Sequence, residues 1–386
     1  MTFKILNTRQ ILIVVGLFLF LTKAESQEDT LKVNLLERGV GLAEDVLDMV
    51  TWEKGHHVIS VYPAVGYSPR TGIEMGVMPV WRIGSHDKTL NRPTTLASSF
   101  QVSTKGMYEA KLDLVSYWRN NWTLWSKLQY LFLPDEFYGI GNGQKSKPYS
   151  QYDLNSFVFS SDLAKGLNEN WFVGIRLDIN RNKHNNVEGD LLSDDVVGVS
   201  GGWANGLGPV LMFDVRNDVL YPSKGWLIIA SSLFYKSYLG SEYDFNLNSI
   251  DIRKYLSVVD DKSVLAFQGV FNASSGDVPF YKMPSVGGKS NLRGIPHPYK
   301  YIDKNSWFTQ VEWRQKVWWR IGAAAFGGAG RVMPSLNSSW FSNLHAVAGV
   351  GLRFQALPQD GLNFRIDYGF SNHNEKALFF TIREAF

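Results

Sequence analysis

The sequence contains no cysteine, so disulfide bonds and lipid anchors on cysteine are excluded. It also lacks the apolar runs of a helical membrane protein, which needs about 18 or more consecutive apolar residues per span. Its one continuous apolar stretch is residues 11–21. Strong charge is missing too, because the net charge is +3 and no block of Lys and Arg occurs. No nucleic-acid partner is therefore expected.

The chain of 386 residues instead carries its apolar surface in short pieces. Hydrophobic residues make up 45% of the sequence and aromatic residues 14%, with 35 glycines, yet the mean hydropathy is slightly negative. The length would allow two or three soluble domains, but a β-barrel of this size forms one domain. The periodicity of the sequence must therefore distinguish several soluble domains from one β-barrel.

Two segments precede the main pattern. Residues 1–24 combine Lys4 and Arg9, an apolar core and a small-residue site that ends at Ala24. This pattern predicts a secretory signal peptide, with a short N-terminal anchor helix as the alternative. Residues 25–57 are polar, with apolar residues near helical spacing, and predict a short helical segment that lies in the periplasm or plugs a barrel.

From residue 58 onward, apolar and polar residues alternate with a period of two. Trp171 and Ile175 share one face of a predicted strand, while Arg176 and Asp178 share the other. A soluble sandwich also alternates, but charges of both signs inside and aromatic residues at the ends of an apolar exterior are typical of a transmembrane barrel. Closure also leaves no backbone group unpaired in lipid. The predicted fold class of residues 58–386 is all-β, a transmembrane antiparallel β-barrel.

About sixteen strands are predicted, an even number of spans of about ten residues each. Alternate connections are mostly short and several of the others are long, as expected of short periplasmic turns and longer outer loops. The strands are predicted near residues 58–67, 71–82, 93–104, 107–118, 121–133, 150–162, 170–182, 206–216, 225–236, 243–257, 263–272, 302–316, 319–331, 343–356, 362–370 and 376–386.

Several motifs carry a family resemblance. Residues 62–73 read YPAVGYSPRTGI, residues 213–226 read FDVRNDVLYPSKGW, and residues 292–295 read LRGI. With GVGLRF and FRIDYG in the last quarter, they resemble the BamA/TamA-like superfamily of outer-membrane barrels, also called the bacterial surface antigen family. LRGI is similar to the family's Val/Ile-Arg-Gly-Phe/Tyr motif and falls between predicted strands eleven and twelve, where the family places it.

In that family the loop folds back into the lumen, and its arginine reaches carboxylates on the wall. A guanidinium withdrawn from water needs an acidic partner. Among the carboxylates on the inward faces, Glu312 is the first candidate partner of Arg293 and Asp367 is the second. Residues 321–330 have side chains small enough for a loop to lie against them. The alternatives are an exposed loop arginine and a solvated lumen network that includes Arg314 and Arg365. The resemblance implies a lumen loop motif made of Gly287, Gly288, Leu292, Arg293, Gly294 and Ile295.

Two departures from the family pattern bear on function. Gly328 occupies a position where the family often has an Asp, so one expected partner of Arg293 is missing. Residues 25–57 are too few for a polypeptide-transport-associated (POTRA) domain, which in the family receives client proteins. We therefore expect a barrel-only form of the family.

The last predicted strand carries a further motif. Residues 377–386 place Leu378, Phe380, Ile382 and Phe386 on one face and end on an aromatic residue. This arrangement resembles the C-terminal signal by which outer-membrane barrels are recognised for insertion. Phe380, Ile382 and Phe386 are the candidate residues of that signal.

No catalytic, cofactor or metal site is predicted. His56 and His57 are adjacent and so point in opposite directions on a strand, and the other histidines lack metal-ligand spacing. The glycine-rich residues 139–143 lack the strand and helix that a phosphate-binding loop requires. No Ser, His and Asn grouping of a phospholipase can be assembled, so the chain is predicted not to be an enzyme.

The predicted function is to assist the insertion or translocation of envelope proteins at the bacterial outer membrane. The partners expected are outer-membrane lipid and other envelope proteins, as clients or complex subunits. In the family that the motifs resemble, the seam between the first and last strands is weakly paired, and an incompletely paired edge can act as a template for an incoming strand. The alternatives are a passive channel narrowed by the loop, which the lumen charges also suit, and a structural barrel that anchors a partner complex.

Overall fold

The computed structural model describes residues 51–84, 94–143, 150–219, 221–259, 262–357 and 362–386. The predicted signal peptide and most of the predicted helical segment lie outside these ranges, and both stay predictions. No helix in the described part of the chain is long and apolar enough to cross a membrane.

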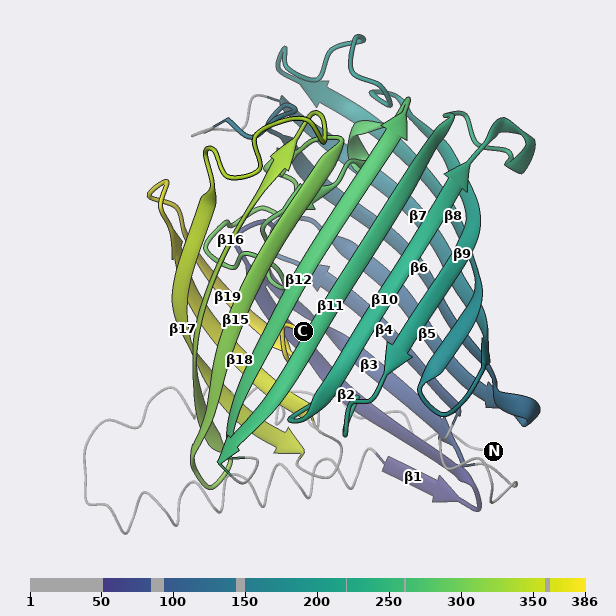
Figure 1. The fold of residues 1–386 in the computed structure, drawn as a ribbon, viewed down its shortest axis with the longest axis vertical. Coiled ribbons are helices and arrows are strands. Elements are labelled where there is room, and N and C mark those ends of the chain that lie inside the picture. Colours follow the sequence, from purple (N-terminus) through teal and green to yellow (C-terminus); the bar gives the residue numbers. More distant parts are fainter. Residues whose placement is uncertain (1–50, 85–93, 144–149, 220, 260–261, 358–361) are drawn as a thin grey trace.

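The fold is a closed antiparallel barrel of sixteen strands (Figure 1). Each strand pairs with its neighbour in chain order, and β19 returns to pair with β2, which closes the cylinder. This confirms the predicted barrel and its strand count. The wall consists of β2 (His57–Ser68), β3 (Gly72–Ile83), β4 (Thr94–Ser103), β5 (Tyr108–Trp118), β6 (Trp122–Phe137), β7 (Ser150–Gly166), β8 (Trp171–Glu188), β9 (Gly201–Asp214), β10 (Gly225–Tyr235), β11 (Phe245–Val259), β12 (Ser263–Gly276), β15 (Asn305–Trp318), β16 (Ile321–Met333), β17 (His345–Leu357), β18 (Leu362–Ser371) and β19 (Lys376–Ile382).

The alternation of the sequence sets the two faces of the wall. On β8, Ile175 is 54% exposed on the outer face, whereas Asp178 is 8% exposed in the lumen. On β15, Trp313 points outward and its neighbour Glu312 is buried inside. Successive side chains of a strand point to opposite faces. The period-two pattern therefore produces both the apolar outer face of the wall and the polar lining of the lumen.

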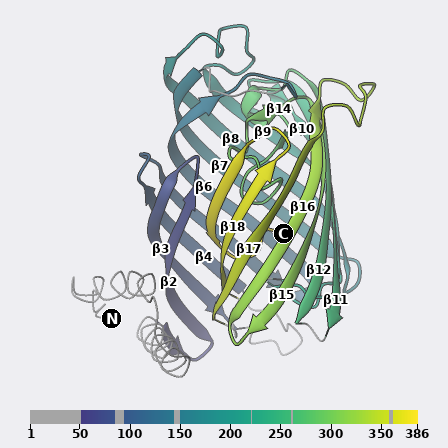
Figure 2. The same cartoon turned by 90° about the vertical axis from the view of Figure 1, so that its left-hand side faces the viewer.

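The two ends of the barrel differ in their connections. Short turns such as 119–121 and 319–320 join strands at one end, while the connections 189–200, 277–304 and 334–344 at the other end are long (Figure 2). This is the asymmetry expected of an outer-membrane barrel. The connection 277–304 is the one that carries the predicted lumen motif.

Both ends of the described chain differ from the prediction. Thr51–Lys54, expected within a helical segment, form strand β1, which pairs with β2. The last strand ends at Ile382 rather than at residue 386, because Arg383 adopts a left-handed φ of 71°. The prediction that Phe386 continues the last strand on the face of Leu378 is therefore wrong, and the role of Phe380, Ile382 and Phe386 as an insertion signal stays a prediction. Phe386 is buried inside with Tyr255 of β11, and the C-terminal mark lies within the barrel outline in Figures 1 and 2.

A charge placed on the outer face tests this orientation. Leu352→Arg on β17 exposes a guanidinium to lipid, and we expect it to lower the free energy of unfolding by about 2–4 kcal/mol if the position lies near the bilayer centre. Val158→Arg on β7, whose side chain lines the lumen, is the matched control and should cost much less. Urea unfolding in lipid vesicles measures both variants, and equal costs would contradict the assignment of the two faces.

Candidate functional site

The connection 277–304 folds back into the lumen. It carries two short strands, β13 (Ser285–Val286) and β14 (Tyr301–Ile302), which pair with each other in antiparallel fashion. The label of β14 lies inside the barrel outline in Figure 2. Ile302 also forms a bridge to Gly141 of the neighbouring connection. We call residues 277–304 the lumen loop.

Two glycines allow the lumen loop to reverse direction. Gly287 and Gly288 have φ angles of 119° and 90°, which L side chains rarely adopt. A Cβ atom at Gly287 would lie 2.7 Å from Cγ2 of Ile295, and one at Gly288 would lie 2.9 Å from Cβ of Pro298. Both conformation and space therefore require glycine at these positions.

The tip of the lumen loop touches the backbone of the wall. A Cβ atom at Gly294 would lie 2.5 Å from the carbonyl oxygen of Phe370, and one at Gly369 of β18 would overlap the carbonyl oxygen of Arg293. Main chain thus lies against main chain, which only paired glycines permit. The FRIDYG motif ends on Gly369, so that motif supplies the clearance for the loop arginine.

An apolar cluster supports the same tip. Leu292 and Ile295 of the lumen loop are fully buried and pack with residues of β15, β16 and β17. Burial of such side chains stabilises by about 1.5–3 kcal/mol each. The cluster consists of Val286, Leu292, Ile295, Tyr301, Phe308, Val332 and Val347.

Arg293 is wholly buried between two wall carboxylates. Its Nη1 lies 2.5 Å from Oε2 of Glu312 and 2.8 Å from Oδ2 of Asp367, and all three side chains have no exposed area. Its Cζ sits 3.8 Å from the centre of the Phe326 ring, within cation–π distance. The structure therefore brings both expected carboxylates to the loop arginine. The functional role of this contact stays a prediction.

The pair is part of a larger buried ion cluster. Arg353 donates from Nη1 to Asp367 at 2.7 Å and from Nη2 to Glu312 at 3.1 Å, and its Nε reaches Glu384 at 2.9 Å. Arg314 donates to Glu312 at 2.6 Å and Arg365 to Asp367 at 2.7 Å. We define the ion cluster as Arg293, Glu312, Arg314, Arg353, Arg365, Asp367 and Glu384.

Gly328 on β16 leaves space for the loop motif. A Cβ atom at Gly328 would lie 3.0 Å from Cδ2 of Leu292 and 2.6 Å from the carbonyl oxygen of Thr309. The space is filled by Leu292 of the loop motif. No carboxylate takes the place of the expected Asp, and among the described residues Nε and Nη2 of Arg293 have no hydrogen-bond partner.

A second polar anchor holds the other arm of the lumen loop. Asp135 of β6 accepts hydrogen bonds from Nε of Arg70 at 2.9 Å and from the hydroxyl of Tyr152 at 3.2 Å, and it contacts Nε2 of His297 at 2.9 Å. Lys282 of the loop reaches Asp178 at 2.6 Å. Burial lowers the pKa of His297 below its ordinary value, although neighbouring Asp135 opposes that shift.

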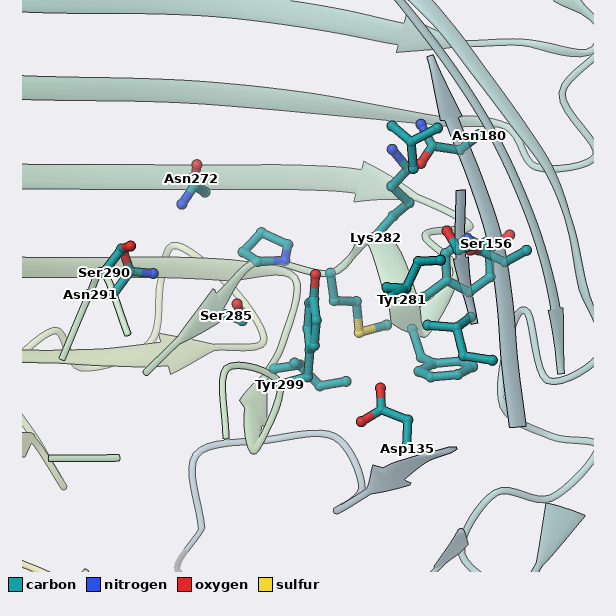
Figure 3. Close-up of a pocket in the computed structure, with 18 of the residues that line it drawn as sticks. Asp135, Ser156, Asn180, Asn272, Tyr281, Lys282, Ser285, Ser290, Asn291 and Tyr299 are labelled. Atoms are coloured by element: carbon teal, nitrogen blue, oxygen red, sulfur yellow. The ribbon is translucent and has the colours of Figure 1, made fainter. Parts of the chain in front are cut away.

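A cavity of about 670 Å³ with a mixed polar and apolar lining remains between the lumen loop and the wall (Figure 3). Asp135, Ser156 and Asn180 line it from the wall, and Lys282 and Tyr299 line it from the loop. Such amide, hydroxyl and charged groups suit water and hydrophilic solutes. Among the described residues, no cluster of three or more His, Asp or Glu is arranged to hold a metal ion.

Sequence reasoning found part of this site. It named the loop motif, Glu312 and Asp367, but it missed Arg353 and Glu384, which complete the ion cluster. Arg353 lies in the GVGLRF motif, so its inward position could have been found by counting alternate residues. Glu384 could not, because the turn at Arg383 takes it off the strand pattern.

Closed sheet, apolar exterior and folded-in loop together define a β-barrel of the outer-membrane type. Residues 90–382 match the family model of the Omp85 superfamily domain, and the chain belongs to that superfamily. No curated protein matches the sequence.

Solved structures share the fold. BamA from Haemophilus ducreyi lacking POTRA domains 1–3 matches with 16% identity and a TM-score of 0.59, over 86% of this chain and 70% of that chain. CdiB from Acinetobacter baumannii matches with 13% identity and a TM-score of 0.55, over 86% of this chain and 60% of that chain. CdiB from Escherichia coli matches with 10% identity and a TM-score of 0.55, over 86% and 64%. At these identities the likeness shows the fold alone, and the chain spans less than two thirds of either CdiB chain.

Substitutions at the wall carboxylate and at the loop arginine of the ion cluster should lower the free energy of unfolding by different amounts. Asp367→Asn leaves Arg293, Arg353 and Arg365 short of a carboxylate inside the wall, and we expect a loss of about 3–5 kcal/mol in the free energy of unfolding. Arg293→Gln removes one of several guanidinium groups and should cost about 1.5–3 kcal/mol. Urea unfolding in vesicles measures both, and a larger loss for Arg293→Gln would contradict the cluster described here.

Docking of the lumen loop should weaken in mild acid. His297 has a lowered pKa when docked and an ordinary pKa near 6.5 when released, so protons bind preferentially to the released state. The contribution of His297 is complete above pH 6.5 and is lost as the pH falls towards the docked-state pKa. A spin label at Lys289→Cys should become more mobile between pH 7.5 and 5.5. A background of His297→Gln should remove that pH step, and an unchanged step would contradict the assignment.

Proposed function

We propose that this protein assists the insertion or translocation of other envelope proteins at the bacterial outer membrane, and that it does so without catalysis. Its outer face meets membrane lipid, and its partners are other envelope proteins rather than nucleic acid. Membership of the Omp85 superfamily supports the general role. The particular support in this chain is the short pairing between its first and last wall strands.

The seam between β19 and β2 is held by little backbone pairing. β18 and β19 pair continuously from Phe364 to Phe370, whereas the register between β19 and β2 contains the single pair Phe380 and Tyr67. An edge with few partners offers its backbone groups to another extended chain. This seam is the place at which a client strand would add to the wall.

The lumen loop supports a role for the seam rather than for an open bore. It crosses the lumen, and its anchors at Arg293, His297 and Lys282 fasten it to three regions of the wall. A bore occupied in this way leaves the seam as the more accessible route for a polypeptide. The ion cluster would then hold the lumen loop against the wall, so that the loop does not itself pair with the strand edges at the seam.

A passive channel is the second candidate function. The cavity beside the lumen loop favours it, since polar groups that suit solute passage, such as Asp135, Asn180 and Lys282, form part of its lining. Large steady currents in planar bilayers that rise when residues 287–295 are deleted would favour the channel. A barrel that anchors a partner complex through its outer loops would instead co-purify with that complex.

A disulfide across the seam tests the first proposal. The chain has no native cysteine, so Tyr67→Cys with Phe380→Cys introduces one defined bond between directly opposed positions. We expect the oxidised protein to lose its support of envelope assembly and reduction to restore it. The readout is the amount of folded outer-membrane barrels in cells that depend on this chain.

The control is a second disulfide inside the firmly paired sheet. Tyr368→Cys with Leu378→Cys joins β18 to β19 at outward-facing, opposed positions and should leave assembly unchanged. Unchanged assembly in the seam-locked protein as well would argue against the proposal.

A further inference from the structure

A second, smaller cavity of about 240 Å³ lies at the end of the barrel that carries the short turns. The neighbouring strands β15, β16, β17 and β18 contribute to its lining, and the connection between β9 and β10 contributes Tyr221 and Ser223. It lies on the lumen side of the wall, because Arg314 and Arg353, which line it, are buried on that face. We call this cavity the rim pocket.

The lining of the rim pocket carries charge of one sign. It includes four cationic side chains and, among the described residues, no Asp or Glu. Glu312 and Glu384 bind two of these cations but do not line the pocket. The other two cations lie outside the ion cluster, so the pocket is a place of positive potential that favours an anion. The four cationic residues are Arg314, Lys316, Arg320 and Arg353.

Arg314 has a donor that the protein does not use. Its Nε donates to Glu312 at 2.6 Å and its Nη2 donates to the carbonyl oxygen of Phe386 at 2.8 Å. Among the described residues Nη1 has no hydrogen-bond partner, although the side chain is only 1% exposed. A buried donor without an acceptor is unfavourable. An oxygen atom of a ligand in the rim pocket would supply the missing acceptor.

The size and chemistry of the rim pocket suit a phosphate group. Its volume lies below the roughly 300–1,000 Å³ of pockets for drug-sized ligands, so it suits a small group rather than a polypeptide segment. Guanidinium and ammonium groups together are typical ligands of phosphate. A Cβ atom at Gly322 would lie 3.3 Å from Cβ of Arg353, so glycine at this position keeps the pocket open between β15 and β17.

Exposed tryptophans indicate the depth of the rim pocket in the membrane. Trp318 ends β15 and is 47% exposed, and Trp319 and Arg320 alone connect it to β16. Aromatic girdles of outer-membrane barrels lie at the level of the lipid headgroups. The pocket is therefore at headgroup level and only a two-residue turn away from the outer face. The other exposed tryptophans at strand ends on this side are Trp81, Trp118, Trp122, Trp171 and Trp226.

We propose that the rim pocket binds a phosphate group, and that the phosphate belongs to the headgroup of a membrane phospholipid that reaches over the turn 319–320. Arg314 donates from Nη1 to a phosphate oxygen, and Lys316 and Arg320 supply the balancing positive charge. The lipid comes from the periplasmic leaflet, the side on which outer-membrane barrels have their short turns. This inference is independent of the proposed function.

Lipid retention tests this inference. Purified protein in an uncharged, phosphate-free detergent receives phosphatidylglycerol, and native mass spectrometry measures the fraction that retains one lipid. Lys316→Gln with Arg320→Gln removes two charges of the pocket and leaves the ion cluster intact, and we expect the retained fraction to fall several-fold. Arg119→Gln with Lys165→Gln is the matched control, because it removes two charges from the same end of the barrel outside the pocket. It should leave retention unchanged.

Inorganic phosphate is the second probe, because it presents the same chemistry without a lipid. Broadening of its phosphorus NMR line by the parent but not by the pocket variant, with no lipid retained, would keep the phosphate site and overturn the headgroup as its source. Binding of neither probe by the parent, or equal retention in the pocket and control variants, would overturn the proposal as a whole.

Heat-modifiable gel mobility shows which variants are folded barrels. Lys316→Gln alone, at an exposed position, carries the test if the double variant does not fold, and an unchanged retained fraction in this folded variant would then overturn the proposal. Because no client protein is present in either experiment, failure of the rim pocket would leave the proposed function standing.

Discussion

A guanidinium with no exposed area has to find its counter-charges inside the protein, and in this barrel Arg293 finds them on two strands of the wall. Withdrawing charges from water costs several kcal/mol for each ion unless partners and hydrogen bonds offset the loss. Glu312 and Asp367 supply these partners, and Arg353 bridges both carboxylates. The lumen loop, the last strands and residues 383–386 therefore meet at one cluster, and none of them can move without changing its charge pairing.

Two glycines of the wall and the end of the chain lie close to the ion cluster. The backbone of Arg293 lies against Gly369, and Leu292 lies against Gly328, so side chains at either glycine would displace the loop arginine. Residues 383–386 turn inward, where Glu384 accepts a hydrogen bond from Arg353, and the pairing of β19 with β2 consists of Phe380 opposite Tyr67. The tip of the lumen loop and the end of the chain thus both lie beside the same buried ion cluster.

The sequence predicts the fold closely because period-two alternation is a local property that each strand expresses by itself. The loop motif was accessible through the resemblance of residues 292–295 to the family's motif, and the inward faces of the predicted strands supplied Glu312 and Asp367 as candidate partners of Arg293. The course of residues 383–386 was not accessible from pattern alone. Residues 377–386 alternate like a strand, and the turn at Arg383 depends on Arg353 and Arg314, which only the closed barrel brings near.

The most direct test of the buried cluster is hydrogen exchange of the intact protein in lipid, without any substitution. Within the lumen loop, the N–H of Gly288 donates to Ile295 and the N–H of Ile295 donates to Leu292, each at 3.0 Å. If the loop is fixed inside the lumen by Arg293, these amides should exchange as slowly as those of β15 beside them. Exchange as fast as that of the outer connection 334–344 would contradict the account.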